Sequence, residues 1–377
     1  MTGAGDDAVR DGIRCMWMRG GTSKAGVFLA EDLPADPAER DDLLLRIMGT
    51  PDPRQIDGLG GATSLTSKVA VVSVATDDDA DVDYLFLQLG VDEPTVSDRQ
   101  NCGNILAAVG PFAVERGLVP AGAETDAQTT VRIRMVNSDS IAAATFPTPG
   151  GRPRYAGDVA IAGVPGTAAP VTLAFSDTEG SATGALFPTG NLVDTVEDIE
   201  VTCVDNGMPV VLVRAADLGL TGEETFDDLA AATALQARVD DLRRRAGTLM
   251  GLGDTAGQSV PKTVAVSAAR DGGDVRLQSF IPVTPHQSLG VLAGVSAVTA
   301  LRVPGAVGHD LIRAAPPGTG RADLEHPSGH LMVDVDVHVD DAGPAATAVR
   351  PDAVRIGRSA VVRTARKLFD GVVFPRT

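Results

Sequence analysis

The sequence is poor in aromatic residues and has no long apolar run, and each shortage excludes a class of protein. Phe, Trp and Tyr make up 3% of the 377 residues, so Val, Leu, Ile and Ala must fill the cores. No apolar run reaches the roughly 20 residues that a membrane-spanning helix needs. The segment from Met1 to Gly12 is acidic and polar, unlike a signal peptide. We therefore expect a cytoplasmic protein that does not enter a membrane.

Cysteine and histidine are also scarce. The three cysteines, Cys15, Cys102 and Cys203, cannot form a disulfide framework, and none has a second Cys or a His at metal-ligand spacing. Of the five histidines, only His326 and His330 are close in sequence. A proline and a glycine lie between them, which argues against a shared helix face of the HExxH type. We expect no metal ion, and we interpret Cys15 and Cys203, which lie in apparent strands, as structural.

Basic residues are fewer than acidic ones, and this imbalance limits which molecules the protein can bind. The chain has 32 Lys and Arg against 50 Asp and Glu, a formal net charge of −18. Such a charge repels nucleic acid and anionic membranes. An acidic small molecule remains compatible only if its pocket is locally basic, so the position of each Lys and Arg is informative. The length and the 44% apolar content suit a two-domain globular protein.

The most informative stretch is the polar turn 101–104, which leads directly into the apolar run 105–114. This order predicts a loop that places Cys102 at the N-terminus of a buried helix. The unpaired N–H groups and the positive dipole end there lower the pKa of a thiol and attract carboxylates. The alternative is a small buried residue that happens to precede a helix. Pro111 predicts a kink or a later helix start.

Two further loops combine glycines with donor groups. Residues 19–24, Arg-Gly-Gly-Thr-Ser-Lys, follow a predicted strand and surround two glycines with donors, without the spacing of a Walker A loop. A hairpin turn with solvated charges is the alternative. Residues 55–68 carry three glycines and end in Lys68, just before a predicted strand. Burial and neighbouring cations would lower the pKa of Lys68 and give a neutral amine that acts as a base, whereas a solvent-facing lysine would be ordinary.

The second half repeats this layout. Residues 284–290 form a polar loop before the apolar run 291–301, and the glycine turn 184–191 suggests a crossing between domains. We expect two similar halves, with two helix N-termini facing each other across a cleft. The remaining elements expected from periodicity are helices at 38–48 and 226–246 and strands at 13–18, 26–29, 69–74, 84–91, 131–136, 141–146, 201–204, 263–267, 275–281, 331–339 and 355–364.

Several separate motifs, in the same order, resemble the PrpF-like isomerases. They are Arg19-Gly20-Gly21-Thr22-Ser23-Lys24, Asp57-Gly58-Leu59-Gly60-Gly61, Ser67-Lys68, Asn101-Cys102-Gly103-Asn104, Pro188-Thr189-Gly190-Asn191, Pro261-Lys262, Glu325-His326-Pro327-Ser328-Gly329 and Arg363-Thr364-Ala365-Arg366. The resemblance implies an α/β (α+β) fold of two diaminopimelate-epimerase-like domains. Each would be a sheet wrapped around a buried central helix, with the active site in the cleft between them. We expect the domains at 1–186, including about 355–377, and at 187–377.

The resemblance also implies site residues. Racemases of this fold use two cysteines, but the second half here offers His286, Gln287 and Ser288 at the matching loop, which argues against a two-thiol racemase. The family pattern instead makes Lys68 and Cys102 the proton-transfer pair, in either direction, without a cofactor. The expected substrate contacts are Arg19, Thr22, Ser23, Lys24, Arg54, Ser64, Ser67, Gly103, Asn104, Thr189, Gly190, Asn191, His286 and Ser288.

The implied reaction is keto–enol tautomerisation of a small polycarboxylate, 4-oxalomesaconate, in the breakdown of gallate-type aromatics. The alternatives within the family are a double-bond shift in oxalomesaconate and cis–trans isomerisation of 2-methylaconitate. A different class, a non-catalytic polycarboxylate-binding protein, would need the loops but neither Lys68 nor Cys102. A homodimer is compatible with the sequence, which does not determine the oligomeric state.

Overall fold

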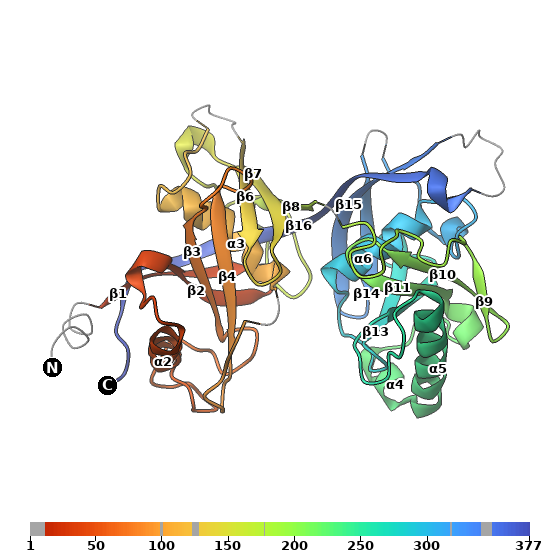
Figure 1. Cartoon of the computed structure of the whole chain (residues 1–377), viewed down its shortest axis with the longest axis horizontal. Coiled ribbons are helices and arrows are strands. Elements are labelled where there is room, and N and C mark those ends of the chain that lie inside the picture. Colours follow the sequence, from red (N-terminus) through yellow and green to blue (C-terminus); the bar gives the residue numbers. More distant parts are fainter. Residues whose placement is uncertain (1–11, 99–100, 123–127, 177, 317–318, 341–348) are drawn as a thin grey trace. The chain divides into compact units, whose positions relative to one another are not determined.

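The computed structural model describes residues 12–98, 101–122, 128–176, 178–316, 319–340 and 349–377. The chain divides into two units (Figure 1): unit 1 runs to Leu173 and takes in Arg363–Thr377, and unit 2 is Ala174–Val362. The boundary expected from the sequence lay between residues 186 and 187. None of the helices in the described ranges is long and apolar enough to cross a membrane.

The sheet of unit 1 is built from short strands of mixed direction. Strands β2–β3 and β4–β6 pair in parallel, whereas β1–β2, β3–β4, β6–β7 and β1–β16 pair antiparallel. The last strand, β16, pairs with β1 through its C-terminal part, so the chain end completes this unit. The strands are β1 (Ile13–Gly20), β2 (Ser23–Leu29), β3 (Lys68–Val74), β4 (Val82–Leu89), β5 (Val96–Ser97), β6 (Gln128–Met135), β7 (Ser140–Pro147), β8 (Pro170–Phe175) and β16 (Val354–Val373).

Among its described residues, unit 1 contains two α-helices, α2 and α3. Helix α2 (Pro37–Met48) begins at Asp36, whose carboxylate accepts from two backbone N–H groups, and ends at Gly49 in the left-handed region. Helix α3 (Gly103–Glu115) is buried from Ile105 to Val114 and packs against strands β1, β2, β3, β4, β6 and β7. The expected helix after Cys102 is confirmed. Pro111 lies inside α3 without ending it or delaying its start.

Unit 2 repeats the pattern of unit 1. Strands β11–β12 and β13–β14 pair in parallel, and β10–β11, β12–β13, β14–β15 and β15–β16 antiparallel. Helix α6 follows β13 as α3 follows β4 and β5, and it is buried from Ala293 to Leu301. The elements are β9 (Asp194–Val196), β10 (Ile199–Asp205), β11 (Pro209–Arg214), α4 (Phe226–Ala231), α5 (Thr233–Leu249), β12 (Lys262–Ser267), β13 (Val275–Phe280), α6 (Val291–Leu301), β14 (Arg321–His326) and β15 (Gly329–Val339).

The expected fold class is therefore confirmed: each unit is a mixed sheet around one buried helix, in the diaminopimelate-epimerase-like manner (Figure 1). Five short 3₁₀ turns complete the elements of the described chain: Ala30–Asp32, Pro149–Gly151, Ala215–Leu218, His309–Leu311 and Pro351–Ala353.

The prediction of a single helix at 226–246 was wrong. The backbone leaves the helical region at Ala232, where ψ is 71°, and the segment forms α4 and α5 instead. The amide of Gln236 donates to the carbonyls of Leu229 and Ala230 at 3.1 and 2.9 Å, so these two carbonyls at the end of α4 have partners. The apolar periodicity continues across the break. For this reason the sequence pattern predicted one helix where the structure has two.

Strand alternation decides which side chains face the buried helix. In unit 1, Cys15, Phe28, Val69 and Leu87 belong to a core that includes residues of α2, so the neighbouring residues on the same strands face α3. Cys15 and Cys203 are both fully buried, and burial raises the pKa of each thiol to about 12. These two thiols therefore stay protonated at neutral pH, in agreement with a structural role.

Candidate active site

The start of α3 has no side-chain cap among the described residues. Cys102 is its N-cap residue, and the first turn holds no acidic residue. The carbonyl of Cys102 accepts from Leu106 N–H at 2.9 Å, which begins the helix. The remaining N–H groups of the first turn and the dipole together favour an anion beside the Cys102 thiol.

Two glycines bring the loop 19–24 onto this helix start. A Cβ at Gly20 would lie 2.3 Å from the carbonyl oxygen of Asn104, and one at Gly21 would lie 2.1 Å from its Oδ1. Gly21 also has a φ of 51°, which disfavours any other residue. The Asn104 amide donates to Thr22 Oγ1 at 3.0 Å. The loop can therefore hold its hydroxyl groups against α3 only with glycine at both positions.

Lys68 is the first residue of β3 and lies on the face towards α3. It is 7% exposed, and its Nζ donates to Oε1 of Gln88, its partner on β4. The Nζ also lies 5.2 Å from the centroid of the Phe86 ring. Burial lowers the pKa of Lys68, and the nearby Cys102 opposes this by raising it. The net lowering of the pKa therefore comes from burial, as expected, whereas the neighbouring cations that were also expected to lower it do not contribute.

Gln88 has a fixed orientation. Its Nε2 donates to the carbonyls of Ser67, Ser64 and Leu89 at 3.0, 3.2 and 3.2 Å. Because the amide nitrogen faces three acceptors, the amide oxygen must face Lys68. Gln88 was not among the site residues expected from the sequence. The only sequence signal for it was a polar residue on a strand that is otherwise apolar on that face.

Ser23 shares this face. It is 1% exposed, and its Oγ has no hydrogen-bond partner within the described ranges. On β2 it alternates with residues that face α2, and Ala25, two residues on, pairs with Lys68. We call Ser23, Lys68, Gln88 and Cys102 the α3 cluster. A buried hydroxyl without a partner, on the same face of the sheet as a buried amine, is a donor available to a ligand.

Tyr84 is a second residue of this face that was not among the expected site residues. It lies on the same face of β4 as Gln88, is fully buried, and its hydroxyl has no partner among the described residues. Burial, and then the nearby Cys102, raise its pKa well above 10. The phenol therefore stays protonated behind the α3 cluster.

Arg19 and Lys24 lie away from this cluster. Gly20 faces α3, so Arg19 points to the opposite side of β1. Its Nη1 donates to Gly21 O at 2.9 Å, Thr364 O at 3.0 Å and Thr364 Oγ1 at 2.9 Å, and it lines a cavity of about 610 Å³ with Arg366. Lys24 alternates with Ser23 on β2 and therefore also faces away from α3. The structure brings neither cation against Lys68 or Cys102.

The loop before β3 uses its own polar groups internally. Ser67 Oγ donates to Gln55 Oε1 at 2.8 Å and to the Thr63 carbonyl at 2.9 Å. Ser64 contributes its carbonyl, which accepts from Gln88. Arg54 is 76% exposed at its side chain and lies 3.7 Å from Asp52. These contacts hold the loop that presents Lys68, and they do not bring Arg54 or the Ser67 hydroxyl to the α3 cluster.

The expected residues of unit 2 fall into two groups. Thr189, Gly190 and Asn191 form a turn closed on itself: Asn191 N–H donates to Thr189 Oγ1 at 3.2 Å, and Gly190 has a φ of 74°. His286 and Ser288 lie in the loop that precedes α6, where Ser288 N–H donates to His286 Nδ1 at 3.0 Å. Within the described ranges, no group of three or more His, Cys, Asp or Glu side chains is arranged to hold a metal ion.

Comparison with known proteins gives matches along the whole chain. A family model described as "PrpF protein" matches residues 10–376. A (4E)-oxalomesaconate Delta-isomerase of Novosphingobium sp. is 52% identical, over 98% of this chain and 99% of its own. A 4-oxalomesaconate tautomerase of Pseudomonas putida is 50% identical, over 96% and 95%. The crystal structure of a methylitaconate-delta-isomerase superposes with a TM-score of 0.84 at 34% identity, covering 96% of this chain and 95% of its own.

Proposed function

Because the chain belongs to the PrpF protein family, we propose that it is an isomerase that interconverts the keto and enol forms of 4-oxalomesaconate without a cofactor. Two relatives with about half of their residues identical carry oxalomesaconate in their names, one as a tautomerase and one as a Delta-isomerase. The enzyme class expected from the sequence, an isomerase, is that of both relatives.

The proposed reaction begins with removal of a proton from the carbon next to the substrate carbonyl. The electron pair of the broken C–H bond passes into the conjugated system and gives an enolate. Protonation on the enolate oxygen then yields the enol. One group must accept the first proton and another must be placed to supply the second. Lys68 and Cys102 fill these roles in either order.

The observation that carries the proposal is the lowered pKa and the fixed position of the Lys68 amine. A lysine at its usual pKa of 10.5 is a poor base at neutral pH, because nearly all of it is protonated. Burial lowers the pKa of Lys68, and Cys102 is near enough to act on the same amine electrostatically. Gln88 holds the amine in one place through its fixed amide oxygen. The N-terminus of α3 and the Ser23 hydroxyl supply donors for the negative charge that develops.

A second candidate, a double-bond shift, uses the same residues. If the enolate is protonated at the far carbon of the conjugated system, the double bond moves and no enol is released. The 52% identity to a Delta-isomerase favours this outcome as much as the 50% identity to a tautomerase favours the first. The two reactions share the first step and differ only in where the second proton arrives.

The test is incubation of the chain with 4-oxalomesaconate in D₂O, followed by ultraviolet absorbance and proton NMR. We expect deuterium uptake together with keto–enol conversion, and a loss of about 10²- to 10⁴-fold in both Lys68→Ala and Cys102→Ala. Lys367→Met is the matched control, because Lys367 is paired with Glu115 at 2.8 Å and lies outside the α3 cluster.

The outcomes separate the candidates. Deuterium uptake at carbon without enol formation would assign the double-bond shift. No exchange with 4-oxalomesaconate or 2-methylaconitate would refute the isomerase and favour a polycarboxylate-binding protein, for which the two alanine variants would bind as the parent does. The cytoplasmic location and the homodimer stay predictions from the sequence.

A further inference from the structure

Lysine is rare in this chain, so the position of each one is informative. There are four: Lys24, Lys68, Lys262 and Lys367. Lys262 is the first residue of β12, as Lys68 is of β3, and each of these strands pairs in parallel with the strand before it. Burial lowers the pKa of Lys262 as it does that of Lys68. In the described part of the chain, the Lys262 side chain has no ion-pair or hydrogen-bond partner.

The Lys262 amine lies at the start of α6. A Cβ at Gly290, the N-cap residue of α6, would be 3.3 Å from Lys262 Nζ. No side chain caps this helix, and its first turn holds no acidic residue. The dipole end of α6 and the ammonium group therefore add their positive potentials at one point.

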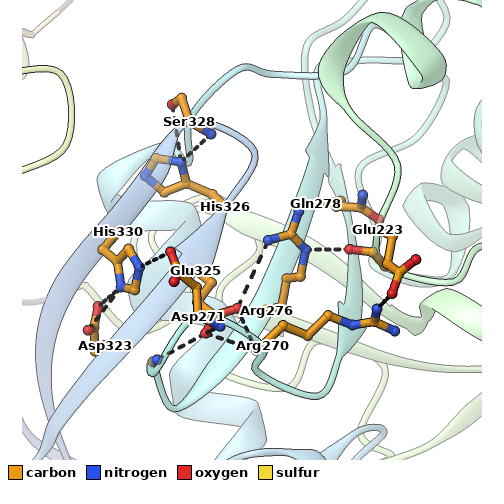
Figure 2. Close-up of polar contacts among 12 residues, drawn as sticks. Glu223, Arg270, Asp271, Arg276, Gln278, Asp323, Glu325, His326, Ser328 and His330 are labelled. Atoms are coloured by element: carbon orange, nitrogen blue, oxygen red, sulfur yellow. Dashed lines mark hydrogen bonds and ion pairs between the residues drawn. The ribbon is translucent and has the colours of Figure 1, made fainter.

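His326 faces the same place from β14. A Cβ at Gly294 of α6 would lie 3.1 Å from Leu324, so Leu324, and with it His326 two residues on, is on the α6 side of β14. Its Nε2 lies 3.5 Å from Ser288 Oγ. Its Nδ1 accepts from Ser328 N–H at 3.3 Å (Figure 2). Because Nδ1 is an acceptor, the neutral ring carries its proton on Nε2 and presents a donor towards Ser288.

Glu325 explains why His326 is held there. Its carboxylate is 1% exposed and accepts from the backbone N–H groups of Arg270 at 2.8 Å, Asp271 at 2.6 Å and Gly273 at 2.9 Å (Figure 2). Successive residues of a strand point to opposite faces, so this clamp fixes the end of β14 and directs His326 towards α6. The negative charge of Glu325 is satisfied on the other face of the sheet.

A buried hydroxyl without a partner lies on the same face. Ser279 is 2% exposed, and its Oγ has no hydrogen-bond partner among the residues that the structure describes. Its neighbour Phe280 packs in the core beside α5, so Ser279 faces α6. It pairs with Val264, two residues along β12 from Lys262, and its carbonyl accepts from His286 N–H at 2.8 Å. An unmet donor this deeply buried indicates a missing acceptor.

We propose that Lys262, Ser279, Ser288 and His326, here called the α6 cluster, form a binding subsite for one carboxylate group of a small polycarboxylate. Every member can donate a hydrogen bond and none is acidic, so the subsite selects an oxyanion. The choice of a carboxylate over a phosphate rests on the proposed function. Ser288 was among the substrate contacts expected from the sequence, whereas Lys262, Ser279 and His326 were not.

The probe is tricarballylate, a saturated tricarboxylate that cannot isomerise, with inorganic phosphate as the second arm. Calorimetric titration of the whole chain should show binding of tricarballylate that weakens about 10- to 100-fold in Lys262→Gln and in His326→Gln, the effect of losing one charge-assisted hydrogen bond. Lys367→Gln should bind as the parent does. Thermal melting of each variant checks that it folds.

A second measurement needs no substitution. Brief acylation with acetic anhydride, followed by digestion and mass spectrometry, reports the reactivity of each of the four lysines. Tricarballylate should slow acylation of Lys262 several-fold and leave that of Lys367 unchanged. Protection by phosphate at lower concentration than by tricarballylate would overturn the assignment to carboxylates.

The subsite and the proposed function can fail separately. The double variant Lys68→Ala, Cys102→Ala should lose isomerisation and still bind tricarballylate through Lys262. An inactive parent chain whose tricarballylate binding depends on Lys262 would refute the function and keep the subsite. Binding that Lys262→Gln leaves within twofold of the parent, or no binding to the parent at millimolar concentration, would overturn the subsite.

Discussion

Replacing Gln88 by glutamate should shift the pH dependence of activity in a known direction. The amide oxygen of Gln88 accepts from Lys68 Nζ and is held there because its Nε2 donates to three carbonyls. Gln88→Glu puts a carboxylate in nearly the same volume, beside the same amine. The ammonium form of Lys68 then gains an opposite charge that the neutral amine does not feel.

The magnitude follows from that geometry. An opposite charge within about 4–6 Å shifts a pKa by about 1–3 units, and burial of the pair keeps the effect from being screened by salt. Gln88→Glu should therefore raise the pKa of Lys68 by about 1–3 units. Gln88→Leu should lower the pKa further, because it removes the acceptor and leaves the amine among apolar groups. The two variants are expected to move the pKa in opposite directions.

The assay is the pH dependence of kcat/KM for 4-oxalomesaconate. If Lys68 is the base, activity rises with pH as the amine loses its proton, and this ascending limb moves to higher pH in Gln88→Glu. If Lys68 is the acid, activity falls with pH as the ammonium group loses its proton. This descending limb also moves to higher pH in Gln88→Glu. Gln236→Glu on α5, where the amide only donates to backbone carbonyls, is the matched control. Limbs that stay in place in both Gln88 variants would refute the role of Lys68 in proton transfer.

Two further predictions concern stability. Gly20→Ala should cost about 1–3 kcal/mol in the free energy of unfolding and lower activity, because its Cβ would lie 2.3 Å from a backbone oxygen of α3. Gly103→Ala, whose Cβ meets no atom within 4 Å, should leave stability nearly unchanged; equal losses in urea denaturation would contradict the steric argument. Glu325→Gln should cost about 1–3 kcal/mol at pH 7 by weakening three backbone contacts, whereas the exposed Glu223→Gln should cost little. Although burial acts to raise the pKa of Glu325, the backbone N–H groups lower it overall, so this stability is present above the usual value of 4.5 and is lost as the pH falls through the lowered pKa. A difference in unfolding free energy between Glu325→Gln and the parent that stays constant from pH 7 to pH 3 would contradict this prediction.

The sequence by itself determined the features that depend on local order. The apolar run after Cys102 predicted α3 and its start, because a polar turn followed by ten consecutive small and apolar residues suits a buried helix. The repeat of this layout near residue 290 predicted the second buried helix. Separate motifs in the same order carried the resemblance to the PrpF-like family. The loop before β3 predicted a lysine that points inward. The helix break at Ala232 was not predicted, because the apolar periodicity continues through it.

Only the tertiary structure decided which polar groups share a face. Arg19, Ser23 and Lys24 are neighbours in sequence, yet strand alternation sends Ser23 towards α3 and the two cations away from it. Gln88 could not be found from sequence, because its contact with Lys68 depends on the register of β3 against β4. Likewise, Lys262 meets the start of α6 across a sequence separation that no local pattern spans. A lysine's type and its loop are local properties, but its burial, and therefore its pKa, is set by the elements that pack around it.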